Sequence, residues 1–392
     1  MTSHTFALNG RRASATFAAS LGLLAACGGD APAIGDGTTD GGTADASGTG
    51  SGNGNGNGNG NGNGNGTGQD AGGGGSDASV PPVGNDAGGG GTTCGVCPTG
   101  FTCDAASNVC KSAGGIPHFG QVYVILMENQ SQSAIVGSTK APYINSLVTA
   151  DAHTTAYTSV TTPSLPNYIA LTSGDTQGIT CDCHPGSVGT ACSGSCNVLS
   201  NCDCTRAVDH LGKQLDAKSL KWRNYGESMG TPCNIQTAGN YAARHIPFLY
   251  YDDVRTNTSY CNDHIVDYAS LAGDLGKYTF SFITPNLCSD MHDTCGGDAI
   301  QNGDNWLKAN VPTILGAPAF AKDAILFIVW DEGGLFGSQT VGLIAHSPLT
   351  KPKFGSPASY DHYSLLATIE EGLGLPKLGK AASAKVMADL FK

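Results

Sequence analysis

The sequence contains little charge. Of its 392 residues only 13% are Asp, Glu, Lys or Arg, and the 20 basic residues are outnumbered by 32 acidic ones. Because no cluster of basic residues exists that could neutralise a row of phosphates, we exclude nucleic acid as a partner. Residues 28–93 hold seven Asp and no Lys or Arg, so they account for much of the formal net charge of -12. We expect the rest of the chain to have a mildly acidic surface.

A long apolar run is also missing. A transmembrane helix needs about 20 consecutive apolar residues, whereas the run within residues 1–27 is shorter and follows Arg11 and Arg12. This run ends in LLAAC, at Cys27, and resembles a bacterial lipoprotein signal peptide. An ordinary secretory signal with a coincidental cysteine is the alternative. We expect an exported chain that is lipid-anchored through Cys27 on the outer or cell-surface side of the cell envelope, or secreted.

Residues 28–93 lack the apolar side chains from which a core is built. They consist mainly of Gly, Asn, Thr, Asp and Ser, and they include an Asn-Gly repeat from Asn53 to Gly66. Such a composition predicts a flexible tether without secondary structure. A tether of this kind would let an anchored domain stand off the membrane.

Cysteine, in contrast, is abundant. Setting Cys27 aside, 14 of the 15 cysteines remain, and an even number in an exported chain indicates disulfides. Residues 94–110 carry four cysteines and predict a small module with two disulfides, with a zinc site as the alternative. The segment from Cys181 to Cys204 contains six cysteines and predicts a surface insertion held by disulfides.

Residues 116–392 have the pattern of a globular α/β domain, in which short apolar runs alternate with amphipathic stretches. We predict buried strands of the parallel type at Val122–Met127, Phe280–Thr284, Ile325–Trp330 and Val341–Ala345. We predict helices near Pro142–Thr149, Leu165–Thr172, Ala207–Ala217, Gln301–Leu315 and Tyr363–Leu373. The expected fold is a doubly wound, mostly parallel sheet flanked by helices, preceded by the disulfide-rich module.

Two of the predicted strands lead directly into acidic residues. Glu128 and Asn129 follow the first strand, and Asp331 and Glu332 follow the third. In a doubly wound sheet, ligands bind at the carboxyl ends of the strands, and oxygen ligands suit a hard divalent cation. The alternative is a pair of ordinary solvated loops, which spacing alone does not exclude.

Ser164 lies in the sequence TTPSLPNYIALTSG, after a proline and before an apolar stretch that we predict to be helical. Amide dipoles at a helix N-terminus favour an anion such as phosphate. A serine beside a metal ion can become a nucleophile, because the ion stabilises the alkoxide. The alternative is an N-capping serine without chemistry.

Three histidines are further candidates. His292 in PNLCSDMHD follows the FSFIT strand, and His362 in SYDHYSLL begins a predicted helix. Either can act as a general acid or contact phosphate. His245 in NYAARHIPF is a weaker candidate of the same kind. The alternative for each is a capping or packing histidine.

These sequences together resemble one family, the bacterial phosphoesterases that include acid phosphatases and phospholipases C, within the alkaline-phosphatase-like superfamily. The resemblance spans about Gly120 to Leu375. It rests on VYVILMENQS, APYINSL, TTPSLPNYIALTSGDTQG, NYAARHIPF, ITPNLCSDMHD, GDNWL, FIVWDEGG and YDHYSLLATIEEGLGLP, in that order.

The resemblance implies a role for each candidate residue. Ser164 would be the nucleophile and would carry a transient phosphoryl group. One divalent metal ion of undetermined identity would be held by Glu128, Asn129, Asp331 and Glu332. His292 and His362 would act on the phosphate and the leaving oxygen, and Asn129, His245 and Asp290 would help to bind the substrate.

The resemblance also bears on the substrate. The phospholipase C branch usually has E-N-R-S-F after its first strand, whereas this chain has ENQSQ, and we expect no additional C-terminal β domains. We therefore expect a monomeric acid-phosphatase-like phosphomonoesterase acting on a small phosphate ester or a phospholipid headgroup. A phospholipase C or another phosphodiesterase is the first alternative, and a non-catalytic surface binding protein is the second.

Overall fold

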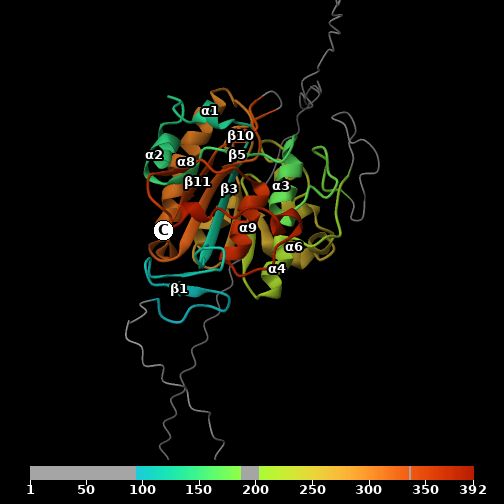
Figure 1. Ribbon diagram of the computed structural model, residues 1–392. Helices are drawn as coiled ribbons and strands as arrows, with labels where there is room; N and C mark the ends of the chain where they lie inside the picture. Colours follow the sequence, from blue (N-terminus) through green and yellow to red (C-terminus); the bar gives the residue numbers. More distant parts are fainter. Residues whose placement is uncertain (1–93, 187–202, 335–336) are drawn as a thin grey trace, which may run out of the picture. The chain divides into compact units, whose positions relative to one another are not determined.

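The structure is a computed structural model, and it describes residues 94–186, 203–334 and 337–392 (Figure 1). The predicted signal peptide with Cys27 and the predicted tether lie outside these ranges, as does the middle of the cysteine-rich segment. In the part of the chain that is described, no helix combines the length and the apolar composition needed to cross a bilayer.

The apolar runs form a central sheet of eight strands. In spatial order these are β12 (Phe354–Ser356), β4 (Ala152–Thr154), β11 (Leu343–His346), β9 (Ala324–Trp330), β3 (Gln121–Met127), β8 (Phe280–Thr284), β6 (Trp222–Gly226) and β7 (Ile265–Asp267). Every residue of β3, β8 and β9 is buried, as expected for strands covered on both faces. Among these eight strands, β11 alone runs against its neighbours. The predicted mostly parallel sheet is confirmed.

The predicted strand Val341–Ala345 is wrong as a single parallel strand. Its first part belongs to β10 (Thr340–Val341), which lies in a separate small sheet, and its second part belongs to β11, which is antiparallel to β9. A parallel crossover needs a dozen or more residues and usually a helix, and no described helix lies between β9 and β11. Gly342 separates the two parts and packs against the Trp330 ring, where a Cβ atom would lie 2.8 Å from it.

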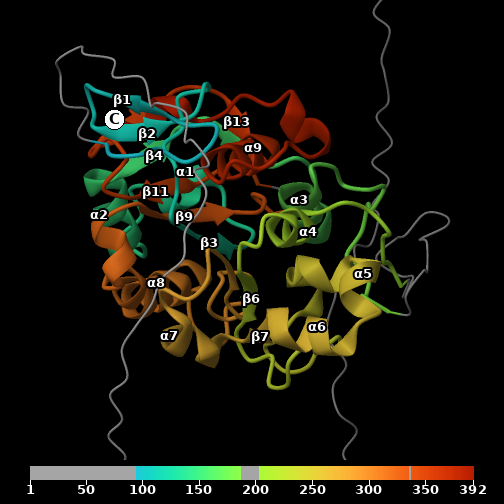
Figure 2. The same ribbon diagram turned by 90° about the horizontal axis from the view of Figure 1, so that it is seen from below.

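Helices cover both faces of the sheet, which confirms the doubly wound arrangement (Figures 1 and 2). On one face α2 packs against α8, and on the other α3 packs against α9. All five predicted helices are present, although the one expected from Ala207 begins at Leu211, with His210 as its N-cap. The helices are α1 (Gln132–Ile135), α2 (Pro142–Ala150), α3 (Ser164–Ser173), α4 (Leu211–Ala217), α5 (Asp252–Arg255), α6 (Thr258–His264), α7 (Leu271–Asp274), α8 (Ala299–Leu315) and α9 (His362–Gly372).

A small second sheet holds the loops that follow the central strands. It consists of β10, β5 (Tyr157–Thr158) and β13 (Tyr360–Asp361), with β10 antiparallel and β13 parallel to β5. The sequence did not predict it, because strands of two residues carry no periodicity. The sheet positions the start of α9, because β13 leads directly into this helix.

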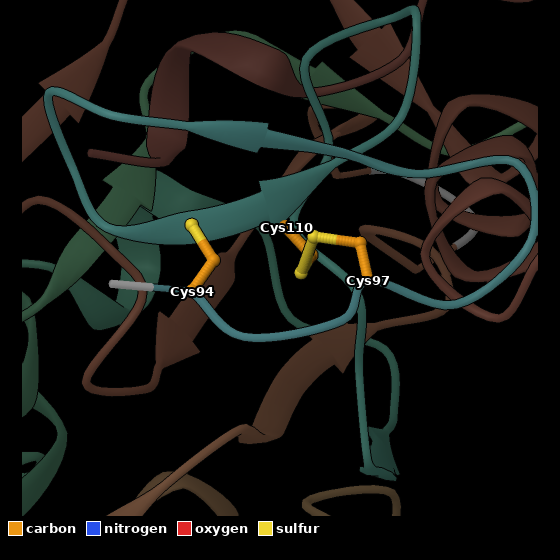
Figure 3. A group of neighbouring side chains, drawn as sticks. All are labelled: Cys94, Cys97 and Cys110. Atoms are coloured by element: carbon orange, nitrogen blue, oxygen red, sulfur yellow. A yellow bond between two sulfur atoms is a disulfide. The ribbon is translucent and has the colours of Figure 1, made fainter. Parts of the chain in front are cut away.

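The cysteine-rich module begins the described chain. Its hairpin consists of β1 (Thr102–Asp104) and β2 (Val109–Lys111). The four cysteines form two disulfides, Cys94–Cys103 and Cys97–Cys110, the second of which is drawn in Figure 3. The disulfide interpretation is therefore confirmed over a zinc site, because each of the four sulfur atoms is already bonded to another.

Three more disulfides join described residues: Cys183–Cys204, Cys233–Cys261 and Cys288–Cys295. Cys181 is disulfide-bonded as well. The first of these bonds closes the base of the segment in which the sequence predicted a surface insertion.

Candidate active site

The two pairs of polar residues that follow β3 and β9 come together. These strands are paired in register up to Met127 and Trp330, so the residues after them leave the same edge of the sheet side by side. The backbone amide of Asn129 donates a hydrogen bond of 3.0 Å to Oδ1 of Asp331. Glu128, Asp331 and Glu332 are all buried, which excludes the alternative of solvated loop acids.

Ser164 is the first residue of α3, and its hydroxyl points at this carboxylate group. The Oγ atom donates to Oε2 of Glu128 at 2.9 Å. The N-cap position belongs to Pro163, and the Ser164 hydroxyl makes its hydrogen bond to Glu128 rather than to a backbone amide of the first turn. Ser164 is therefore not a simple N-capping residue, although it lies where the helix presents its free amides.

Asn167 fixes the turn that presents Ser164. Its Oδ1 atom accepts hydrogen bonds from the amides of Val160 and Thr161, at 3.0 and 3.1 Å. Its Nδ2 group donates to the carbonyl oxygens of Thr161 and Pro163. All four polar contacts of the side chain are thus made to the backbone, which explains why an asparagine follows the serine in this turn.

His245 lies between two buried carboxylates. It ends a short 3-10 helix, Ala243–His245, and its Nε2 and Nδ1 atoms are 3.4 Å from Glu128 Oε1 and from Asp290 Oδ2. Its ring stacks on that of Tyr168, whose hydroxyl donates to Glu128. Neither ring nitrogen has a hydrogen-bond partner among the described residues. His245 is thus held by packing, with both nitrogens facing anionic oxygens.

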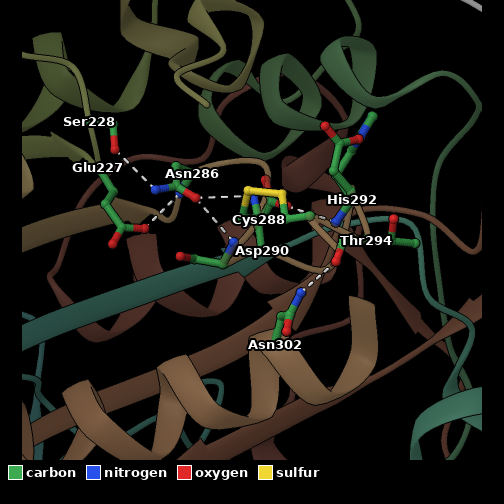
Figure 4. Close-up of a disulfide and its surroundings, with 11 residues drawn as sticks. Glu227, Ser228, Asn286, Cys288, Asp290, His292, Thr294 and Asn302 are labelled. Carbon is green, nitrogen blue, oxygen red and sulfur yellow. Dashed lines mark hydrogen bonds and ion pairs between the residues drawn. A yellow bond between two sulfur atoms is a disulfide. The ribbon is translucent and has the colours of Figure 1, made fainter. Parts of the chain in front are cut away.

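Asp290 and His292 are carried by a loop that a disulfide closes. Figure 4 shows the Cys288–Cys295 bond beside Asp290 and His292. The His292 amide donates to Asp290 Oδ1 at 2.8 Å, and the carbonyl of Asp290 accepts from the amide of Glu128 at the same distance. The loop is therefore attached directly to the end of β3. Asp290 is fully buried, whereas about a quarter of the His292 side chain is exposed.

His362 also lies at the site, but both of its ring nitrogens are engaged. As the first residue of α9, it places Nε2 2.7 Å from the carbonyl oxygen of Asp331 and Nδ1 2.9 Å from the Tyr157 hydroxyl. Because its ring is fully buried, it has no nitrogen left for a phosphate or a leaving group. This arrangement favours a positioning role over the direct role that the sequence suggested.

Three residues of the site were missed from the sequence: Tyr168, Asp182 and Arg244. Arg244 places Nη2 3.2 Å from His292 Nε2. Asp182 accepts a hydrogen bond from the amide of Leu165, at 3.0 Å, through Oδ1. Arg244 was within reach of sequence reasoning, since it precedes His245. Asp182 lies between two cysteines of the segment that the sequence assigned to the surface.

Burial dominates the electrostatics of the carboxyl groups. It raises the pKa of Glu128 and of Asp290 well above the usual range, and neighbouring carboxylates add to the effect at both residues. Burial likewise raises the pKa of Asp331 to about 7 and that of Glu332 to about 8. Burial lowers the pKa of the two buried imidazoles, because it disfavours their charged form. The pKa of His245 lies well below its usual value, and that of His362 is about 4.

Several buried oxygen atoms of the site also lack hydrogen-bond partners among the described residues: Asn129 Oδ1, Asp290 Oδ2, Asp331 Oδ2 and Glu332 Oε2. Buried polar atoms are normally paired, and several carboxylates in one place repel one another when ionised. A divalent cation would satisfy both the oxygens and the charge. The chemistry of these oxygen donors therefore suits a divalent metal ion.

Comparisons with known proteins indicate the family to which the chain is similar. The model of the Phosphoesterase family matches residues 138–376. A phosphatidylinositol-3-phosphatase of Mycobacterium tuberculosis is 28% identical over 291 residues, which cover 73% of this chain and 88% of that protein. An acid phosphatase of Aspergillus fumigatus is 28% identical over 244 residues, and the alignment covers 58% of this chain but only about half of the fungal protein, 49%.

Solved structures resemble the chain more distantly. A protein in the alkaline phosphatase superfamily from Vibrio parahaemolyticus aligns with a TM-score of 0.46 and 12% sequence identity, over 72% of each chain.

Proposed function

Because the chain belongs to the phosphoesterase family, whose members hydrolyse phosphate esters, we propose that it is a metal-dependent phosphomonoesterase with Ser164 as its nucleophile. The contact between Ser164 Oγ and the buried Glu128 carboxylate, at the N-terminus of α3, carries this proposal. The two curated relatives described above are both named phosphatases, which favours monoesters over diesters.

The reaction begins at Ser164. Its Oγ atom attacks phosphorus as the bond from phosphorus to the ester oxygen breaks, and its proton leaves toward Glu128, with which it is hydrogen-bonded. Both ring nitrogens of His292 have partners in the resting site, since Nδ1 lies 2.7 Å from Asp293 Oδ1 and Nε2 accepts from Arg244. The ring is partly exposed, and Nε2 would exchange the Arg244 contact for the leaving oxygen in order to protonate the departing alcohol. Water then attacks the phosphoserine from the opposite side and gives a proton to His292 as the bond from phosphorus to the serine oxygen breaks. Glu128 returns its proton to Ser164, which restores the hydroxyl, and inorganic phosphate is released.

Glu128, Asn129, Asp331 and Glu332 would hold one divalent cation, and its identity is left to experiment. When bound, the cation would supply positive charge that stabilises the serine alkoxide and the phosphoryl oxygens. Hydrogen bonds within the chain hold these four residues in position. Asp331 and Asn129 are fixed to each other, and His362 fixes the backbone of Asp331 from the other side.

The assay that tests the function compares three substrates. Purified protein should hydrolyse a chromogenic phosphate monoester faster than the corresponding bis-ester or phosphatidylcholine, and a chelator should abolish the activity. Faster turnover of the bis-ester or of phosphatidylcholine would identify a phosphodiesterase instead. Absence of turnover on all three with several divalent cations would indicate a binding protein.

The positioning role of His362 predicts a measurable effect for Tyr157→Phe. The substitution removes the hydroxyl that contacts Nδ1 and leaves a buried nitrogen unpaired, which should lower the free energy of unfolding by about 1–3 kcal/mol. The value of kcat should fall about tenfold or less, while KM changes little, because the ring no longer holds Asp331 firmly. Denaturant unfolding and steady-state kinetics measure the two effects. Loss of all activity with unchanged stability would show that Tyr157 or His362 acts on the substrate directly.

The raised pKa values predict how the metal-free protein responds to pH. The folded-state pKa of Asp331 is about 7 and that of Glu332 about 8, above the ordinary values of 3.8 and 4.5. The folded chain therefore binds more protons than the unfolded chain, and this stabilisation is complete below about pH 4 and is lost as the pH rises to about 8. With a chelator present, Tm should decline across this window, and the decline should be smaller in an Asp331→Asn, Glu332→Gln protein. If the decline is equally steep in that protein, these two carboxyls are not its source.

We also propose that the protein is exported and lipid-anchored through Cys27. The described disulfides support an oxidising compartment. In the producing cell, Cys27→Ser should move the protein from the membrane fraction to the soluble fraction. Membrane association that survives this substitution would show that the anchor lies elsewhere.

A further inference from the structure

We propose that Asp182 is an internal competitor of the substrate: its carboxylate occupies donor groups that the phosphoryl oxygens of a substrate or product would use. This inference rests on the proposed function of the Ser164 site. Asp182 belongs to the segment from Cys181 to Cys204, so one residue of this segment would lower the affinity of the enzyme for phosphate.

The two contacts of Asp182 connect Arg244 to the helix that begins with the nucleophile. Oδ1 accepts from the amide of Leu165, the residue directly after Ser164, in the first turn of the ten-residue helix α3. Oδ2 lies 3.8 Å from Nε of Arg244, and this nitrogen has no hydrogen-bond partner among the described residues. A helix N-terminal amide and a guanidinium are groups that bind phosphate well. A phosphoryl group on or beside Ser164 would therefore meet the same donors.

Asp182 is not an ordinary helix cap. In α8 and α9 the capping carboxylates, Asp298 and Asp361, belong to the residue immediately before the helix. Asp182 instead comes from a separate segment, 17 residues away from the amide that it contacts.

The Asp182 side chain can turn away from its two donors while its backbone stays in place. About a third of the Asp182 side chain is exposed, so the carboxylate can turn into water without becoming a buried unpaired charge. On either side, Cys181 and Cys183 are disulfide-bonded, the latter to Cys204. The Tyr250 hydroxyl donates to the carbonyl of Cys183 at 2.6 Å. The carboxylate is thus kept at a high effective concentration beside the donors.

The consequence is competition without any covalent step. Phosphate binds only when it displaces the Asp182 carboxylate from the Leu165 amide and Arg244. The substrate and the product phosphate therefore bind more weakly than they would if Asp182 were absent. Product inhibition is reduced accordingly, and the same residue would discriminate against weakly binding anions.

The test is a titration with inorganic phosphate that does not depend on turnover. Calorimetry would compare the Ser164→Ala protein with Ser164→Ala, Asp182→Asn, in the presence of the divalent cation that supports hydrolysis by the parent. Asn keeps an oxygen that can accept from the Leu165 amide, removes the negative charge and places an NH2 group instead of an oxygen toward Arg244. We expect Kd for phosphate to fall by about tenfold, as expected for the loss of one nearby negative charge at a partly exposed site.

The matched control is Asp209→Asn in the same background. Asp209 is exposed and pairs with Lys213, so this substitution removes the same charge without a contact to the site and should leave Kd unchanged. Asp182→Ser, which also retains an oxygen, serves if the Asn protein does not fold. In the catalytic background, the product-inhibition constant for phosphate should fall in parallel with Kd.

The outcomes separate the two proposals. If the parent hydrolyses phosphate esters and the Asp182 variants bind phosphate with unchanged or weaker affinity, the competitor role is wrong and the proposed function stands. If the parent neither hydrolyses esters nor binds phosphate, the proposed function and the competitor role both fail.

Discussion

Replacing Ser164 by Ala should lower kcat for a phosphate monoester by at least about a thousandfold, with a loss of stability of no more than about 1–3 kcal/mol. The substitution removes the oxygen that attacks phosphorus. The loss of stability should stay small, because the hydroxyl contacts only carboxylates of the site, Glu128 and Asp331, and does not cap the helix. Steady-state kinetics and thermal unfolding of the same preparation measure the two quantities.

Ser173→Ala is the matched control for this experiment. Ser173 is a buried serine at the other end of α3, and its hydroxyl donates to the carbonyl of Ile169 at 2.9 Å. Its removal should change stability slightly and leave kcat close to that of the parent. If the Ser164→Ala protein keeps the full metal-dependent activity, the serine is not the nucleophile and another group must attack phosphorus.

Replacing Asp331 by Asn should produce the second large effect, a fall of at least about a hundredfold in kcat/KM at low metal concentration. Asp331 is fully buried, and its Oδ2 atom is free for a cation while Oδ1 accepts from Asn129. Asn retains the size of the side chain but removes the charge. A divalent cation that binds only the folded parent should raise its Tm, and this rise should be much smaller in the variant.

Asp304→Asn controls for the loss of a buried carboxylate elsewhere. Asp304 accepts from the amides of Tyr143 and Ile144 and therefore holds the start of α2, away from Ser164. This variant should have a lower Tm but an unchanged rise in Tm on addition of the cation. An Asp331→Asn protein that is stabilised by the cation as strongly as the parent would exclude Asp331 as a ligand.

The sequence predicted the parts of the site that follow from regular structure. Glu128 and Asp331 end apolar strands that are paired in register, so the parallel sheet alone brings them to one edge. Ser164 likewise begins a helix that its apolar sequence predicts. In these cases the periodicity of the sequence and the rules of sheet geometry determine where a side chain lies.

Other parts of the site could not be predicted, because tertiary contacts place them. Asp182 reaches the helix through a segment whose position depends on disulfides, and disulfide connectivity is not readable from a sequence. The engagement of both His362 nitrogens depends on Tyr157, which lies in a strand of two residues. Likewise, the position between β10 and β11 is occupied by Gly342, where the Trp330 ring leaves no space for a side chain, and this contact is not visible in the sequence.

The most direct test of Ser164 as the nucleophile is to trap the phosphoryl group on the protein. Active enzyme would be mixed with a fast chromogenic monoester, quenched in acid within one turnover, digested and analysed by mass spectrometry. We predict phosphate on the peptide that contains Ser164, and its absence from the Ser164→Ala protein. Phosphate on a different residue, or a full burst of alcohol without any phosphorylated peptide, would contradict the account.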